Sequence, residues 1–138
     1  MIQIVKDADT RPWFFLQTAH TTYGMRVMET GHLEHLYYGE RITVDSQDPA
    51  SCAPLVIQRA FAPGNTCTYD REHPQISMED VCLEVGTLGK GDIREPFLEV
   101  RFADGSVTSD FTFDSYKIIT LKEREQCLQD SGLPHSYS

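Results

Sequence analysis

The chain has 138 residues, of which 40% are hydrophobic and 24% charged, and its formal net charge is −9. That length is enough for one domain with a core that folds without disulfides or metal. The acidic balance argues against binding to nucleic-acid phosphates, and no run approaches the ~20 apolar residues of a membrane span, so neither nucleic acid nor membrane is expected as a partner.

Alternating and aromatic residues predict β-strands in the first third of the chain. Residues 3–6 alternate, and the aromatic-rich segment 12–18 is expected to be a strand that begins at its proline. Residues 21–38 predict a hairpin with its turn at 30–32, and the second strand could extend through 40–44.

The middle of the chain changes character. Residues 45–80 carry four prolines and little periodicity, which predicts a long loop region over a core, with one short extended segment at 53–61. A short apolar stretch at 81–85 then leads into the glycine-rich loop 86–91. Its glycines allow backbone conformations that other residues rarely adopt.

Residues 97–113 predict a second hairpin, because Asp104-Gly105 is a preferred two-residue hairpin turn. The side chains expected to point inward are Leu98, Val100, Phe102, Val107, Phe111 and Phe113. The alternation changes phase afterwards, which indicates a bulge near 114–115. Residues 122–129 are the one helix-like segment. The regular strand spacing predicts one all-β, antiparallel domain.

The histidines and cysteines form no strong metal or catalytic motif. His32 and His35 are three apart, and on a strand they would point to opposite faces, which disfavours a shared metal. No two cysteines form a C-x-x-C pair, so all four are expected to be reduced thiols: Cys52, Cys67, Cys82 and Cys127. We expect neither a metal nor a cofactor.

Asp92 and Glu95 flank Arg94 in the glycine-rich region. Paired carboxylates could act as general acid and base in sugar hydrolysis, but two acids this close to an arginine more often form a local ion pair or cap. Aromatic residues near loops or strand ends, such as Tyr38, could stack on a sugar ring or could serve the core or an interface.

The chain contains, in this order, the segments GHLEHLYYG (31–39), QRAFAP (58–63), GKGDIREP (89–96), ADGSVTSDF (103–111) and GLPHSY (132–137). Together they resemble the N-terminal part of α-galactosidases of glycoside hydrolase family 36. The resemblance covers the chain from Thr22 onward.

The resemblance implies an antiparallel β-sandwich, part of a β-supersandwich, that precedes a catalytic (β/α)8 barrel. The whole enzyme would hydrolyse terminal α-galactosides such as melibiose and raffinose, with both catalytic aspartates in the barrel. Residues 1–138 would be the N-terminal part of the sandwich domain, without the barrel, so this chain alone is expected to be inactive and to hold no catalytic residue. The N-terminus has no apolar core of a signal peptide, so a cytoplasmic location is expected.

By position, the resemblance assigns a set of candidates for the substrate mouth or an interface: Tyr38, Gln58, Arg59, Arg71, Asp92 and Arg94. In tetrameric members, N-terminal domains of neighbouring subunits reach the active-site mouth, which implies a homo-oligomer. For Asp92 and Arg94, a structural pair that holds the glycine loop is an equal alternative. A stand-alone carbohydrate-binding module and a protein-interaction β-domain remain open alternatives for the chain.

Overall fold

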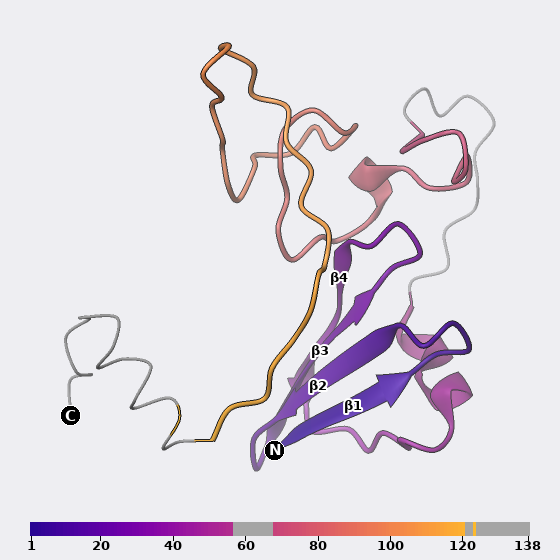
Figure 1. The fold of residues 1–138 in the computed structure, drawn as a ribbon. Coiled ribbons are helices and arrows are strands. Elements are labelled where there is room, and N and C mark those ends of the chain that lie inside the picture. Colours follow the sequence, from indigo (N-terminus) through magenta and orange to yellow (C-terminus); the bar gives the residue numbers. More distant parts are fainter. Residues whose placement is uncertain (57–67, 121–122, 124–138) are drawn as a thin grey trace.

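The computed structural model describes residues 1–56, 68–120 and 123. One antiparallel sheet holds the strands in the order β1-β2-β3-β4 (Figure 1). The strands are β1 (Ile2–Lys6), β2 (Pro12–Gln17), β3 (Thr21–Val27) and β4 (Leu33–Glu40), and the two short 3-10 helices are η1 (Pro49–Leu55) and η2 (Met78–Asp80). The all-β class and the strands predicted within 3–6, 12–18 and 21–38 are confirmed.

One face of the sheet carries the main core. The aromatic residues Trp13 and Phe15 alternate with Phe14 along β2, so they share a face, where they pack with Val5 of β1. The segment after β4 covers this face with Val44 and Cys52, and the fully buried side chain of Phe15 lies at its centre.

The chain leaves β4 at Glu40 and does not extend the strand through 40–44 as predicted. The side chain of Gln17 donates to the carbonyl of Ile42 at 2.9 Å, and that of Gln3 donates to the carbonyl of Val44 at 2.6 Å. These bonds carry the segment across the core face of the sheet. The backbone there is thus held by side chains of β1 and β2 and, through the bond from the N–H of Ile42 to the hydroxyl of Thr22, by a side chain of β3, without a backbone ladder.

The opposite face of the sheet is crossed by the segment that follows residue 106 (Figure 1). The rings of Phe113 and Tyr116 lie 5.9 and 5.1 Å from the ring of Phe14. The backbone N–H of Phe113 donates to the carbonyl of Gly31 at 2.7 Å, which ties the segment to the turn between β3 and β4. This segment covers only part of the face, and Leu16 is 40% exposed there.

The hairpin predicted at 97–113 is wrong as a strand pair, although its turn forms. Gly105 has φ +86°, and the N–H of Phe102 donates to the carbonyl of Ser106 at 2.9 Å. The flanking residues form no strand in the part of the chain that the structure describes. Their backbone donors bond to other loops, as when Phe97 donates to Gly86 and Ser109 donates to Leu88.

The physical reason is the absence of a layer beneath the alternating side chains among the described residues. Leu98, Phe102 and Phe111 were expected inward, but they are 42%, 48% and 44% exposed. Period-two alternation predicts a strand only where one face finds something to pack against. The bulge predicted near 114–115 is wrong as well, because these residues belong to no pair of strands.

Three remaining predictions concern loops and ends. The long loop region predicted at 45–80 holds η1 and η2 in its described residues. Of the extended segment expected at 53–61, residues 53–55 belong to the 3-10 helix η1, and 57–61 lie outside the described residues. Of the helix expected at 122–129, only Glu123 is described, and it is assigned as helix.

Candidate functional site

The best-defined charged pair outside the sheet joins Asp92 and Arg94. Arg94 donates through Nε to one carboxylate oxygen and through Nη2 to the other, both at 2.8 Å. The same Nη2 also donates to the carbonyl of Met78 at 3.0 Å. A two-pronged pair of this kind fixes orientation as well as charge. It links the glycine-rich loop to η2 and leaves the Arg94 side chain 44% exposed.

Glycine is required at two points of this loop. Gly89 and Gly91 have φ of +101° and +89°, a region that L side chains rarely adopt. A Cβ at Gly89 would also lie 2.5 Å from the Cγ2 of Thr108. The glycines therefore let the loop pass close to the segment at Thr108 and present the Asp92–Arg94 pair.

The electrostatics of the pair do not suit Asp92 to general acid catalysis. The hydrogen bond from Arg94 lowers the pKa of the Asp92 carboxyl below its ordinary value of 3.8, against the opposing effect of burial. A general acid needs a pKa near the working pH. Asp92 is therefore held as a carboxylate, and Glu95 beside it is exposed. The arrangement of Asp92 and Arg94 therefore suits residues that are held in place for a contact better than it suits a general acid and a general base.

Substituting Arg94→Lys should loosen this loop without unfolding the sheet. A lysine ammonium cannot reproduce the planar, two-pronged bond of the guanidinium. We expect the pKa of Asp92, followed by NMR of its carboxyl carbon, to rise toward 3.8. The exposed Arg101 provides the matched control: Arg101→Lys should leave the Asp92 titration unchanged. An unaltered Asp92 titration in Arg94→Lys would contradict this account.

The other predicted mouth residues are not gathered around this pair. Tyr38 lies on β4, is 70% exposed, and has its ring 6.1 Å from the ring of Tyr23. Arg71 is exposed in the loop before η2. No contact in the described part of the chain joins Tyr38 or Arg71 to Asp92 or Arg94. Gln58 and Arg59 lie outside the described residues.

A polar cluster beside Tyr38 was missed by the sequence analysis. Glu84 accepts a hydrogen bond from the hydroxyl of Tyr23 and shares one with Nδ1 of His35 at 3.1 Å. Burial, followed by the bond to Glu84, raises the pKa of Tyr23 to about 12. Glu84 arrives from a distant segment, so no local pattern of residues indicates the cluster.

His32 belongs to a second network and does not share a ligand with His35. Its Nε2 lies 2.7 Å from Oδ1 of Asp110, and Tyr69 donates to the other oxygen of Asp110 at 2.8 Å. Lys90 lies 3.5 Å from the same carboxylate. This Asp110 network joins the β3–β4 turn to three loops. The two histidines of the H-x-x-H pattern thus have different carboxylate partners: His32 contacts Asp110, and His35 contacts Glu84.

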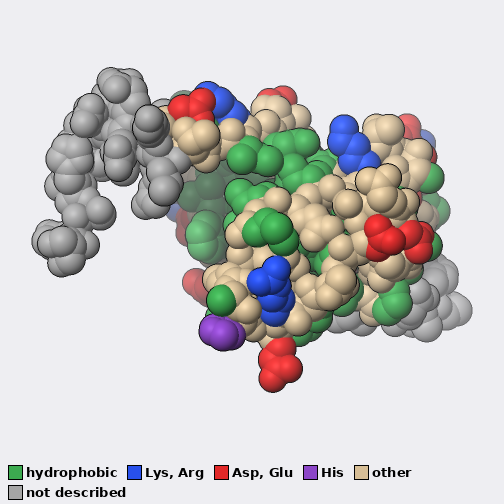
Figure 2. All heavy atoms as spheres, turned by 90° about the horizontal axis from the view of Figure 1, so that it is seen from below, with side chains coloured by type: hydrophobic (Ala, Val, Ile, Leu, Met, Phe, Trp, Pro, Cys, Tyr) green, Lys and Arg blue, Asp and Glu red, His purple; other side chains and the backbone are tan. Residues whose placement is uncertain are grey.

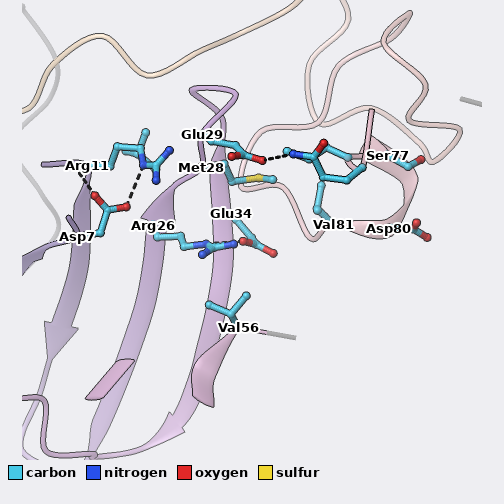
Figure 3. A pocket seen from close by; sticks show the side chains of 13 residues that line it. Asp7, Arg11, Arg26, Met28, Glu29, Glu34, Val56, Ser77, Asp80 and Val81 are labelled. Carbon is cyan, nitrogen blue, oxygen red and sulfur yellow. Dashed lines mark hydrogen bonds and ion pairs between the residues drawn. The ribbon is translucent and has the colours of Figure 1, made fainter. Parts of the chain in front are cut away.

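A pocket with a volume of about 320 Å³ lies between the β1–β2 turn, the ends of β3 and β4, and the loop around η2 (Figure 3). Arg26 and Glu34 are opposite each other in the β3–β4 register and form an ion pair at 2.7 Å. The guanidinium of Arg26 also lies 5.2 Å from the ring centre of Trp13. Arg26 and Glu34 lie at equal distances along the sequence from the turn between β3 and β4. That spacing could have predicted their ion pair, but the pair was not predicted.

The rim of this pocket is also charged. Asp7 accepts two hydrogen bonds from Arg11, each at 2.9 Å, and Gln75 donates to Glu29 at 2.9 Å. Burial acts to raise the pKa of Asp7, but the bonds from Arg11 outweigh it and the pKa is lowered. The polar side chains on the rim are therefore bonded to one another, and apolar side chains, among them Val27, Val56 and Val81, complete the lining.

Cys52 and Cys82 are free thiols, and burial raises the pKa of the Cys52 thiol. Cys67 and Cys127 lie outside the described residues. Among the described residues, no group of three or more His, Cys, Asp or Glu side chains is placed to hold a metal ion. Over the same residues, no helix has the length and apolar character needed to span a bilayer.

Comparison with known proteins decides the family. Residues 31–138 match the glycosyl hydrolase family 36 N-terminal domain. The chain belongs to family 36. The chain is 35% identical over 122 residues to the bifunctional α-galactosidase/sucrose kinase AgaSK of Mediterraneibacter gnavus, and 29% identical over 124 residues to the α-galactosidase AgaA of Geobacillus stearothermophilus. These alignments cover 88% and 90% of the chain.

Solved structures agree with the fold of this family 36 domain. The α-galactosidase from Lactobacillus brevis superposes with a TM-score of 0.66 at 33% identity over 82% of the chain, and the galactosidase domain of AgaSK with 0.63 at 28% over 83%. The chain spans only 12% and 15% of the two curated relatives and 14% and 15% of the two solved chains. The all-β sandwich class is thus confirmed for the matched segment.

Proposed function

We propose that this family 36 chain is the non-catalytic N-terminal part of an α-galactosidase that hydrolyses terminal α-galactosides of the melibiose and raffinose type. The observation that carries the proposal is the family match over residues 31–138, together with relatives whose names state α-galactosidase activity. The catalytic (β/α)8 barrel would lie in a part of the enzyme beyond residues 1–138. The sequence that follows the codon for Ser138 decides this, and a reading frame without a barrel would contradict it.

Within such an enzyme, the domain would act as a scaffold, make oligomer contacts and shape the mouth of the active site. Support for the contact role comes from the loop that carries Asp92 and Arg94. Ile93 and Phe97 beside the pair are 81% and 79% exposed, so these apolar side chains would be available to another domain or subunit. The enzyme would be a cytoplasmic homo-oligomer without a cofactor.

The proposal that Arg94 helps to shape the mouth of the active site rests on how its side chain is held. Its partner Asp92 has a side chain that is only 6% exposed. In the enzyme that carries the barrel, Arg94→Lys is then expected to raise KM for melibiose more than it lowers kcat. KM should change more than kcat because a group that only positions or contacts the substrate stabilises the ground state and the transition state equally. A fall in kcat with unchanged KM would contradict the role.

The isolated 138-residue chain should neither turn over an aryl α-galactoside nor bind galactose, melibiose or raffinose detectably. Turnover requires an acid and a nucleophile held at defined separation across a cleft. Release of the aryl group is followed by absorbance, and binding by titration calorimetry. Activity that co-purified with the chain would overturn the first expectation. Binding in the millimolar range or tighter would favour a stand-alone carbohydrate-binding module.

A further inference from the structure

The glycine-rich loop 86–91 is held against the segment 108–110. The hydroxyl of Thr87 donates to the carbonyl of Ser109 at 2.8 Å, and the N–H of Ser109 donates to the carbonyl of Leu88 at 3.0 Å. Thr87 and Ser109 are both buried. Separating buried polar groups that bond to each other leaves them without partners, which costs free energy. The loop is therefore fixed against this segment.

The side chain of Asp110 joins that contact to two other parts of the chain. Its Oδ1 lies 2.7 Å from Nε2 of His32 in the β3–β4 turn. Its Oδ2 accepts from the hydroxyl of Tyr69 at 2.8 Å and lies 3.5 Å from Nζ of Lys90 in the glycine-rich loop. The same Nζ lies 5.6 Å from the centre of the Tyr69 ring. One carboxylate thus contacts the turn, the loop before η2 and the glycine-rich loop.

The segment that carries Asp110 is itself anchored on the sheet. The N–H of Phe113 donates to the carbonyl of Gly31 at 2.7 Å. Further along, Phe113 and Tyr116 line a hollow of about 310 Å³ together with Phe14 of β2. Figure 2 shows hydrophobic side chains gathered along a hollow on the underside of the molecule. The position of the glycine-rich loop is therefore set relative to the sheet.

The anchor of Arg94 leads back to the same carboxylate. Nη2 of Arg94 donates to the carbonyl of Met78 at 3.0 Å. Met78 is 1% exposed and belongs to an apolar cluster against which Tyr69 also packs. Tyr69 in turn donates to Asp110. The loop that carries Arg94 is thus held at two places, at Lys90 and at Arg94 itself, and Asp110 lies between the two anchors.

We infer that Asp110 is a positioning residue of the proposed active-site mouth: it holds the glycine-rich loop and, through this loop, sets the place of Arg94. The inference rests on the proposed function, in which Arg94 helps to shape that mouth. Misplacing a substrate-positioning group by about 1 Å can cost about 100-fold in rate. Groups that hold such a residue therefore affect substrate binding without touching the substrate.

Amide exchange in this chain tests whether Asp110 holds the loop. Lys90→Met removes the link to Asp110 at a side chain that is 41% exposed, so the chain should stay folded. The amide proton of Ser109, bonded to the loop, should exchange about two- to fivefold faster, the scale set by an exposed ion pair. The amide proton of Phe113, on the same segment, should not change. Lys117→Met, at a side chain 74% exposed, is the matched control and should alter neither. Unaltered exchange at Ser109 in Lys90→Met would overturn the inference.

Kinetics of the enzyme that carries the barrel test the effect on the mouth. Asp110→Asn should raise KM for melibiose by about three- to tenfold, within the range of coupling between residues of one network, and should change kcat less than about twofold. Lys90→Met should raise KM as well, and Lys117→Met should leave it unchanged. A purely structural role would instead reduce the fraction of folded enzyme, which lowers the apparent kcat and leaves KM as it was.

A double variant shows whether Asp110 acts through Arg94. Combining Asp110→Asn with Arg94→Lys should raise KM by less than the product of the two single effects, because both changes act on the same contact. A full product would overturn the inference, and so would an unchanged KM in Asp110→Asn while Arg94→Lys raises it. An unchanged KM in Arg94→Lys would instead remove the proposed role of Arg94. The exchange of Ser109 would then still decide whether Asp110 holds the loop.

Discussion

Replacing Phe15 by alanine is expected to cost about 3–5 kcal/mol of unfolding free energy, the range for a large aromatic side chain deleted from a packed core. Phe15 is 0% exposed and lies between Val5, Trp13 and the covering residues Val44 and Cys52. The neighbour Gly24 packs its backbone against the ring, where an added Cβ would lie 3.1 Å from Cε1, and it has no side chain that could move into the space left by the ring. Urea denaturation followed by far-ultraviolet circular dichroism measures the loss.

The matched control for this prediction is the same substitution at a surface position. Phe111 is 44% exposed, and Phe111→Ala should cost less than about 1 kcal/mol. Equal losses at Phe15 and Phe111 would show that the face with Trp13 is not the main core. Domain stabilities are about 5–15 kcal/mol, so Phe15→Ala could leave a substantial part of the chain unfolded.

Substituting Asp110→Asn should remove about 2–3 kcal/mol, the scale of hydrogen bonds made to a charged group when a partner loses its charge. The carboxylate is bonded to His32 and Tyr69 and lies near Lys90, and an amide cannot accept on both sides. These contacts connect the β3–β4 turn with the segment that crosses the sheet. Asp114, exposed and nearby in sequence, provides the control Asp114→Asn, which should be nearly neutral.

The effect of Asp110→Asn should depend on pH in a defined direction. Burial acts to raise the pKa of Asp110, but the bonds from His32 and Tyr69 and the charge of Lys90 outweigh it, so the pKa lies below its ordinary value of 3.8. A lowered native pKa contributes stability that is present above pH 3.8 and is lost as the pH falls through the native pKa. The difference between parent and variant should therefore be full near pH 6 and shrink below about pH 4. A constant difference down to low pH would contradict the ion-pair account.

The sheet was predictable because its signals are local. The strands β1 to β4 follow from alternation within short windows and from turns at their ends, and Pro12 begins β2 at a position where no hydrogen bond from its nitrogen is needed. The hairpin at 97–113 has an equally clear local pattern, yet only its turn forms. A strand needs a partner layer, and that depends on chain segments far away in sequence.

In the candidate site too, some contacts could be predicted from the sequence and others depend on the fold. Asp92 and Arg94 are two residues apart in a loop with Gly89 and Gly91, so their pairing could be expected from the sequence. The bond from Arg94 to the carbonyl of Met78 spans 16 residues and could not. Glu84 and Tyr23, 61 residues apart, meet only through the fold.

The sequence by itself therefore determined the strand-forming segments of the first third of the chain, the special glycines of the loop and the resemblance to family 36, since each depends on residues near one another in the chain. The tertiary structure decided which long-range partners hold these parts together, such as Asp110 with His32 across 78 residues. Burial and long-range contact are properties of the folded chain as a whole, and a local pattern of side chains does not contain them.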